Sequence, residues 1–107
     1  HISGDFESLD ITDIPQNIKP QIFMGIKTSV DNYMPHYSPY DILLIANDRN
    51  PRFTEDCIII YGNNVFIARR NPCGNGKFEY VSIRDNRSRC SEGDVDDVIG
   101  YVAYVSS

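Results

Sequence analysis

Residues 24–46 read MGIKTSVDNYMPHYSPYDILLIA and predict a strand, an exposed polar turn and a second strand. The second arm, Ile42 to Ala46, is a continuous apolar run of strand length. The centre, residues 31–35, contains Asp, Asn and Pro, which favour a turn. A turn of this kind displays side chains, and the sequence leaves open whether they form a catalyst, a recognition surface or neither.

Beyond Ala46 the chain continues as short β-rich runs separated by turn residues. The strongest hairpin joins residues 56–61 to residues 65–70 through Gly62, Asn63 and Asn64, because Gly and Asn tolerate positive φ. Further strands are expected at 21–30, 77–84 and 98–105, with turns or loops at 31–40, 47–51, 71–76 and 85–94.

Short strands at near-regular spacing predict an all-β fold, either a strongly curved sheet or a small, partly open barrel. In the strand at 21–30 we expect Ile22, Met24 and Ile26 to share one face. Residues 1–20, which are acidic and contain two prolines, are expected to form a lead-in or linker with a short turn at 6–9. Residues 21–107 then form a single domain.

Composition narrows the class of protein. The 107 residues carry 41% hydrophobic side chains, which suits one compact domain. The net charge of -5 argues against direct nucleic-acid contact, because phosphates require clustered Lys and Arg. No apolar run approaches the roughly 20 residues that span a bilayer, and no signal peptide is recognisable at the start. We therefore expect a cytoplasmic protein without a membrane partner.

Cofactor and metal sites are not expected. Three cysteines without a Cys-x-x-Cys do not form a zinc or disulfide framework. Cys57 is expected in the core, and Cys73 and Cys90 in polar turns as free thiols, with a bridge between these two left open. The acidic residues 92–97 lack the spacing of a calcium loop, and the glycines of 74–77 precede a strand rather than a helix.

Three tyrosines, Tyr33, Tyr37 and Tyr40, lie in or beside the turn. Two interpretations are equally open. The rings could form a contact surface, since tyrosine offers a large contact area at a low cost in entropy. They could instead fold over the end of the sheet and cover the core. His36 in the same turn is more simply a solvated histidine than a catalytic base, since no partner is indicated.

The order of motifs resembles a known family. The segments 24–27, 31–35 and 38–45, followed by the hairpin, residues 80–83 and residues 98–102, resemble the C-terminal domain of LexA-like and lambda-type phage repressors. The resemblance covers about residues 20–105. It implies the small, strongly curved β fold of that domain.

The resemblance also implies where a catalytic pair would stand. Self-cleaving members use a Ser directly before the Met of the turn and a Lys on the second hairpin strand. Tyr33 and Ala68 occupy these positions here. A Ser–Lys pair requires a neutral amine as base, which Ala68 lacks. We therefore expect no catalytic residue and no enzymatic activity.

What remains is self-association. The resemblance implies an oligomerisation and regulatory domain of a helix-turn-helix repressor, acting as a homodimer or higher oligomer. DNA would be contacted only through an N-terminal domain outside this chain, and an antirepressor or inducer protein is a further expected partner. The candidate dimer-interface residues are Val98, Tyr101, Ala103, Tyr104 and Val105. The candidates for lining the former cleft or for binding are Asn32, Met34, Tyr37, Tyr40 and Arg69.

Two alternatives remain open. The first is an active peptidase with a relocated pair, drawn from Ser29 or Ser38 with Lys27 as base. The second is a module that senses a peptide or small molecule in the former active-site cleft, lined by Tyr33 and Ala68.

Overall fold

The computed structural model of the chain describes residues 6–9, 22–28, 33, 36–39 and 41–106. The strands in chain order are β1 (Phe6–Leu9), β2 (Ile22–Thr28), β3 (Ile42–Ala46), β4 (Asp56–Tyr61), β5 (Asn64–Gly74), β6 (Lys77–Ser82), β7 (Arg89–Ser91) and β8 (Asp97–Ser106). A short 3-10 helix, η3 (Glu92–Asp94), precedes β8.

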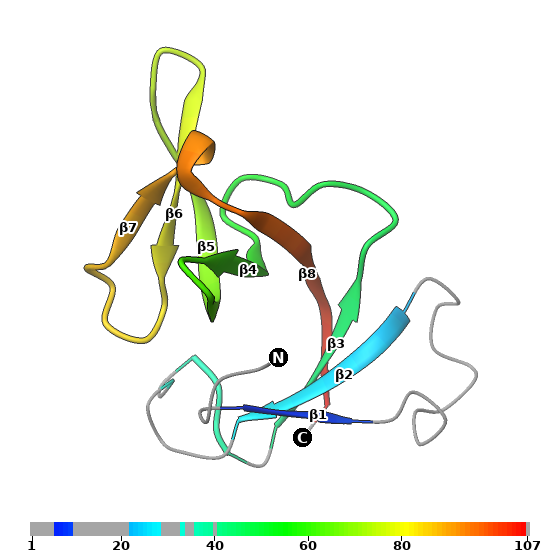
Figure 1. The fold of residues 1–107 in the computed structure, drawn as a ribbon. Coiled ribbons are helices and arrows are strands. Elements are labelled where there is room, and N and C mark those ends of the chain that lie inside the picture. The colour runs from blue at the N-terminus through cyan, green and yellow to red at the C-terminus, as the bar shows by residue number, and fades with distance from the viewer. Residues whose placement is uncertain (1–5, 10–21, 29–32, 34–35, 40, 107) are drawn as a thin grey trace.

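The strands form one antiparallel sheet in the order β1-β2-β3-β8-β4-β5-β6-β7 (Figure 1). The sheet is strongly curved, and β1 and β7 form its two edges within the described residues. This confirms the all-β prediction of a curved sheet. The form is an open sheet, not a closed barrel.

β8 joins the two halves of the sheet. It crosses from the group β4–β7 to the group β1–β3 (Figure 1). Its first part pairs with β4 from Asp97 to Tyr101, and its second part pairs with β3 from Tyr101 to Ser106. Within the described residues, the strand pairing between the two halves therefore runs through β8.

Both faces of the central strands are buried. Along β3, Leu43 and Ile45 point into one group of packed side chains, whereas Leu44 and Ala46 point into another. The first cluster contains Ile26, Tyr33, Tyr37, Leu43, Ile45, Ile58, Val65, Ile67 and Ile83. The second cluster contains Ile22, Leu44, Ala46, Cys57, Ile59, Ala68, Tyr80, Cys90 and Tyr101. Burial on both faces explains why β3 is a continuous apolar run rather than an alternating one.

The expected common face of Ile22, Met24 and Ile26 is wrong. The register between β2 and β3 shifts between Ile22 and Met24, which leaves Phe23 as an extra residue. Because side chains alternate with period two, one inserted residue sends Ile22 to the second cluster while Met24 and Ile26 stay with the first.

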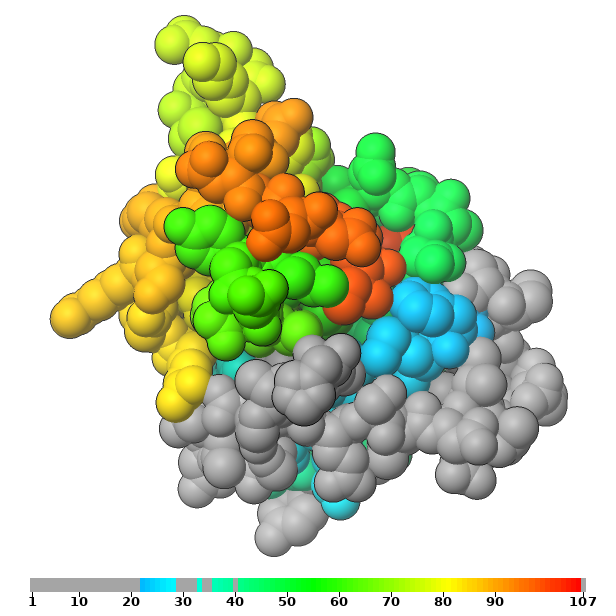
Figure 2. Space-filling view, viewed as in Figure 1, coloured from blue at the N-terminus to red at the C-terminus, as the bar shows by residue number. Residues whose placement is uncertain are grey.

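The predicted hairpin of β4 and β5 is confirmed, and its turn has two residues rather than three. Gly62 and Asn63 both have positive φ, which matches the right-handed twist of the strands. A second two-residue turn, Asn75-Gly76, also has positive φ and joins β5 to β6. This hairpin projects from the body of the molecule (Figures 1 and 2).

The turn expected at residues 71–76 is therefore too long. β5 continues through Pro72 to Gly74. The ladder with β4 ends at the pair Asp56–Arg69, so within the described strands Pro72 pairs only with β6. A strand position with one neighbour tolerates proline, because its missing N–H need not serve a second ladder.

Two further expectations differ from the structure. Residues 85–94 are not loop throughout, since they include β7 and η3, and Cys90 on β7 is buried in the second cluster rather than placed in a polar turn. Residues 6–9 are not a turn but the strand β1, which pairs with β2. The rest of the predicted lead-in, residues 1–5 and 10–20, lies outside the described residues.

Candidate functional site

The turn before β3 is filled by tyrosine side chains. Tyr33 is 2% exposed and Tyr37 is 7% exposed, and both pack into the first cluster. The backbone N–H of Tyr37 donates to the carbonyl oxygen of Tyr33 at 3.0 Å. For these two rings the structure supports the interpretation as a cover on the core. Asn32, Met34 and Tyr40 lie outside the described residues.

Asp56 links the turn to the β4–β5 hairpin. The Tyr37 hydroxyl donates to Oδ2 of Asp56 at 2.5 Å, and Nε of Arg69 donates to Oδ1 at 2.9 Å. The Asp56 side chain is only 10% exposed. Burial, and then the hydrogen bond to Asp56, raise the pKa of Tyr37 well above its usual value. One carboxylate thus holds a phenol and a guanidinium in place.

This arrangement stabilises the turn but does not activate a nucleophile. The phenol of Tyr37 keeps its proton at neutral pH, as a tyrosine ordinarily does, and its raised pKa reinforces this. The guanidinium of Arg69 does not act as a base in proteins. Both groups donate to Asp56, so the network is an ion pair extended by a hydrogen bond.

Tyr33 and Ala68, the two expected active-site positions, are not brought together. Tyr33 belongs to the first cluster and Ala68, 1% exposed, belongs to the second. Neighbouring residues of a strand point to opposite faces, so it is Arg69 that reaches the side of the turn. Ala68 instead lines a pocket on the other face.

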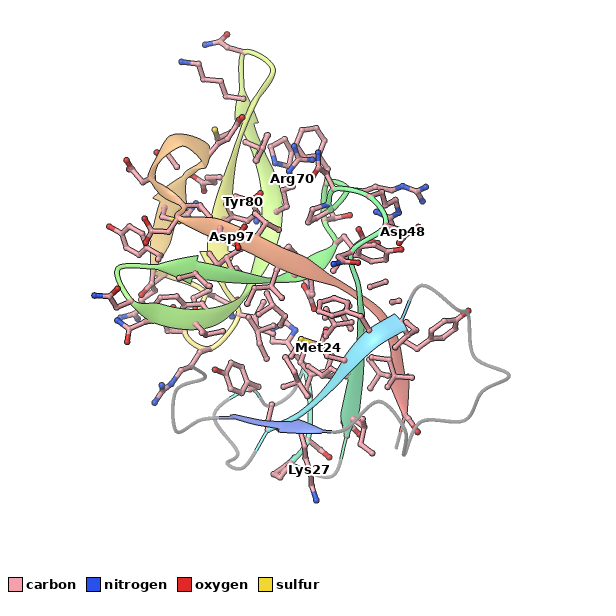
Figure 3. The ribbon with its side chains drawn as sticks, turned by 45° about the vertical axis from the view of Figure 1, so that its right-hand side comes forward. Met24, Lys27, Asp48, Arg70, Tyr80 and Asp97 are labelled. Carbon is pink, nitrogen blue, oxygen red and sulfur yellow. The ribbon has the colours of Figure 1, made fainter. Side chains whose placement is uncertain are left out.

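The alternative pair of Lys27 and Ser38 is also not assembled. Buried Thr28 donates from Oγ1 to the Ser38 carbonyl oxygen at 3.2 Å, so the Thr28 side chain faces this turn. Lys27, the preceding residue on β2, points away from the body of the sheet (Figure 3). His36 is half-buried in the same turn, and Ser29 lies outside the described residues.

The five candidate interface residues on β8 differ in exposure. Val98 and Ala103 are half-buried against the second cluster, and Tyr101 is 5% exposed within it. Only Tyr104 and Val105 are well exposed, at 40% and 46%. Tyr104 pairs with Leu44 and Val105 with Leu43, so the two side chains point to opposite faces of the strand.

Tyr101 has an internal role. Its hydroxyl donates to Oδ1 of Asp48 at 2.6 Å, and this bond, with burial, raises the pKa of Tyr101. The Arg49 guanidinium stacks 3.8 Å from the centre of its ring. Arg49 also donates twice to Glu55, at 2.8 Å each, which lowers the Glu55 pKa. These groups border a polar pocket of about 470 Å³ beside Ala103 and Tyr104.

The acidic residues before β8 are used within the fold. Oδ2 of Asp96 accepts the N–H of Gly62 at 2.9 Å, and Oδ2 of Asp94 accepts the Ser91 hydroxyl at 2.9 Å. In the part of the chain that the structure describes, no group of three or more His, Cys, Asp or Glu side chains is placed to hold a metal.

The cysteines are all free thiols. Cys57 is fully buried, as expected, and burial raises its pKa to about 12. Cys73 is exposed near the tip of the β5–β6 hairpin.

Asp56 is the important residue that the sequence analysis did not single out. The hairpin offers a signal for it. With the two-residue turn Gly62-Asn63, counting back from the pair Tyr61–Asn64 places Asp56 opposite Arg69. Opposite charges at paired strand positions predict an ion pair.

No family model matches the chain, and neither a curated protein nor a solved structure matches it. No helix within the described ranges combines the length and the apolarity needed to cross a membrane.

Proposed function

We propose that the chain is the oligomerisation and regulatory domain of a helix-turn-helix transcription regulator with a LexA-like scaffold. The observation that carries the proposal is the pair of large apolar side chains at the end of β8. Tyr104 and Val105 are 40% and 46% exposed and adjacent in sequence. Aromatic side chains of this kind are enriched in protein interfaces.

A two-fold symmetric contact suits the exposed end of β8, the Tyr104–Val105 patch. In a symmetric dimer the same surface meets itself, so each exposed side chain contributes twice. Because Tyr104 and Val105 point to opposite faces of β8, a partner that covers the end of the strand can shield both. A desolvated aromatic at the centre of such a contact typically contributes about 2 kcal/mol or more.

The turn supports a binding domain rather than an enzyme. Tyr33 and Tyr37 fill the core side of the turn, and Asp56 and Arg69 secure it from the hairpin. Groups held in this way are not available for acyl transfer. Catalytic activity is therefore not part of the proposal.

The negative net charge of the chain supports a regulator in which a different domain contacts DNA. At -5 it repels a phosphate backbone, so DNA would be contacted by an N-terminal domain outside this chain. A dimer would raise the effective concentration of two such domains at a two-fold symmetric operator. Such a regulator would work in the cytoplasm, and an antirepressor or inducer protein would act on the dimer.

The test is the oligomeric state of the chain in solution. Sedimentation at micromolar concentration should show a dimer, and Val105→Asp or Tyr104→Ser should weaken self-association at least about tenfold, because about 1.4 kcal/mol of contact energy corresponds to that factor. The matched control is Tyr61→Ser, which removes an equally exposed aromatic (44%) from the far end of β4. The proposal fails if the chain is monomeric or if all three variants behave alike.

A further inference from the structure

A pocket lies on the second-cluster side of the β4–β7 half of the sheet. Four neighbouring strands and the loop before β7 contribute to its wall. The lining residues are Ile59 and Tyr61 of β4, Phe66 and Ala68 of β5, Tyr80 and Ser82 of β6, and Ser88, Arg89 and Cys90. The turn of Tyr33 and Tyr37 belongs to the first cluster, so this pocket is separate from it.

The pocket exists because two small residues face each other between large ones. Ala68 and Ser82 are direct partners in the β5–β6 ladder, so their side chains stand side by side on one face. Phe66 and Tyr80, two positions away on the same face of each strand, carry rings. Small side chains between aromatic ones leave a hollow that the fold itself does not fill.

The size of the hollow limits its occupant. The pocket measures about 190 Å³. A dry engineered cavity of about 150 Å³ lined by aliphatic and aromatic side chains accommodates benzene. The space therefore suits a single six-membered ring with a short substituent.

The polar residues of the lining indicate which end of a ligand would be charged and where that end would lie. Tyr80 is 5% exposed and Cys90 is 9% exposed, whereas Arg89 is a well-exposed side chain at the rim. Arg89 donates from Nη1 to Glu79, and its guanidinium carries further N–H donors on Nε and Nη2. Glu79 does not line the pocket. An anionic group at the rim would meet the remaining N–H donors of Arg89, whereas the Ser88 hydroxyl already donates to Oδ2 of Asp85 at 2.7 Å.

We propose that this pocket binds a small monocyclic carboxylate. The ring would lie over Ala68 and Ser82 between the walls of Phe66 and Tyr80, and the carboxylate would point to Arg89. The proposal goes beyond the oligomerisation function and does not rest on it. A guanidinium beside a carboxylate gives a charge-assisted, geometrically specific pair, which selects acids over neutral compounds of the same shape.

The test is a titration of the isotope-labelled chain with phenylacetate, followed by amide chemical shifts. A ligand of about ten non-hydrogen atoms in a half-open site is expected to bind at about 1 mM or tighter. Shift changes should saturate and concentrate on β4–β7. Phenylacetamide, which is neutral and of the same shape, should bind about tenfold more weakly, because one charge-assisted bond corresponds to about that factor.

Variants separate the pocket from the rest of the surface. Arg89→Gln should remove the preference for the acid over the amide. Arg87→Gln, at an exposed position of the loop just before β7 and outside the pocket, is the matched control and should keep the preference. Ser88→Tyr, at an exposed lining position, should block binding of both compounds while the amide spectrum stays folded.

Three results would overturn the proposal. The first is the absence of saturable shifts with phenylacetate up to about 10 mM, well above the expected affinity. The second is equal binding of acid and amide. The third is a set of shifts outside β4–β7, or on the Tyr104–Val105 patch, which would place the ligand elsewhere.

Discussion

Gly100 on β8 lies directly against the carbonyl oxygen of Ala46 on β3. A Cβ atom at residue 100 would be 2.4 Å from that oxygen and 2.8 Å from Cγ2 of Ile45. The contact occurs where β8 leaves β4 and joins β3. Because the obstructing atom belongs to the backbone of a central strand, it cannot move without shifting the ladder.

Gly100→Ala should therefore destabilise the fold. Overpacking of a tight interior typically costs about 1–3 kcal/mol, and a backbone obstacle places this site at the upper end. Urea unfolding followed by circular dichroism measures the change. Gly93→Ala is the control, because a Cβ there meets nothing within 4 Å, and its effect should stay within about 0.5 kcal/mol. Similar losses in both variants would contradict the steric explanation.

The loss of stability should depend on which partner of the Tyr37–Asp56 hydrogen bond is removed. Tyr37→Phe removes the donor and should cost about 1–2 kcal/mol. Asp56→Ala should cost more, about 2–4 kcal/mol, because it leaves the buried phenol and Arg69 without their acceptor. Chemical denaturation of both single variants and of the double variant gives the coupling energy. A coupling near zero would show that the two groups act independently.

Cys57 should make stability depend on alkaline pH. Burial raises its pKa in the folded protein from 9.0 to about 12. The unfolded chain therefore releases this proton first, so the stability is fully present below pH 9.0 and is lost as pH rises toward 12. Within that window the free energy of unfolding should fall by up to about 1.4 kcal/mol per pH unit from this group.

The measurement is urea unfolding at several values of pH above neutrality. Cys57→Ala should lower stability at neutral pH, since it removes a buried sulfur, but should show a shallower alkaline decline. Cys73→Ala is the matched control, because that side chain is exposed and should leave the slope unchanged. Parallel slopes for wild type and Cys57→Ala would exclude a contribution from the buried thiol.

Elements with a strong local pattern are predictable from the sequence. The continuous apolar run Ile42–Ala46 matches β3 residue for residue, and the β-rich end of the chain forms β8. β1 and β7 are not predictable in this way. They are short edge strands of four and three residues, and their conformation depends on pairing with a neighbour rather than on their own composition.

The contacts of the candidate site likewise differ in how far the local sequence predicts them. The Asp56–Arg69 pair follows from the hairpin register, once the turn is known to have two residues. The Tyr37–Asp56 bond joins residues 19 apart, and no local spacing specifies it. Tyr33 and Ala68 are separated because their side chains belong to different core clusters. Sequence order alone does not determine which cluster a side chain enters.

Arg49 should not be replaceable by lysine. Its guanidinium makes two parallel bonds to Glu55 at 2.8 Å and stacks 3.8 Å from the ring centre of Tyr101. Arg49→Lys keeps the charge but loses the planar fork and the stacking, so a loss of about 1 kcal/mol is expected.

Arg52→Lys is the matched control for this substitution. Arg52 is exposed and reaches Glu55 through its backbone N–H, which lysine retains. Urea unfolding at low salt should therefore show a change within about 0.5 kcal/mol for the control. If both lysine variants keep wild-type stability, net charge rather than guanidinium geometry holds the loop against β8.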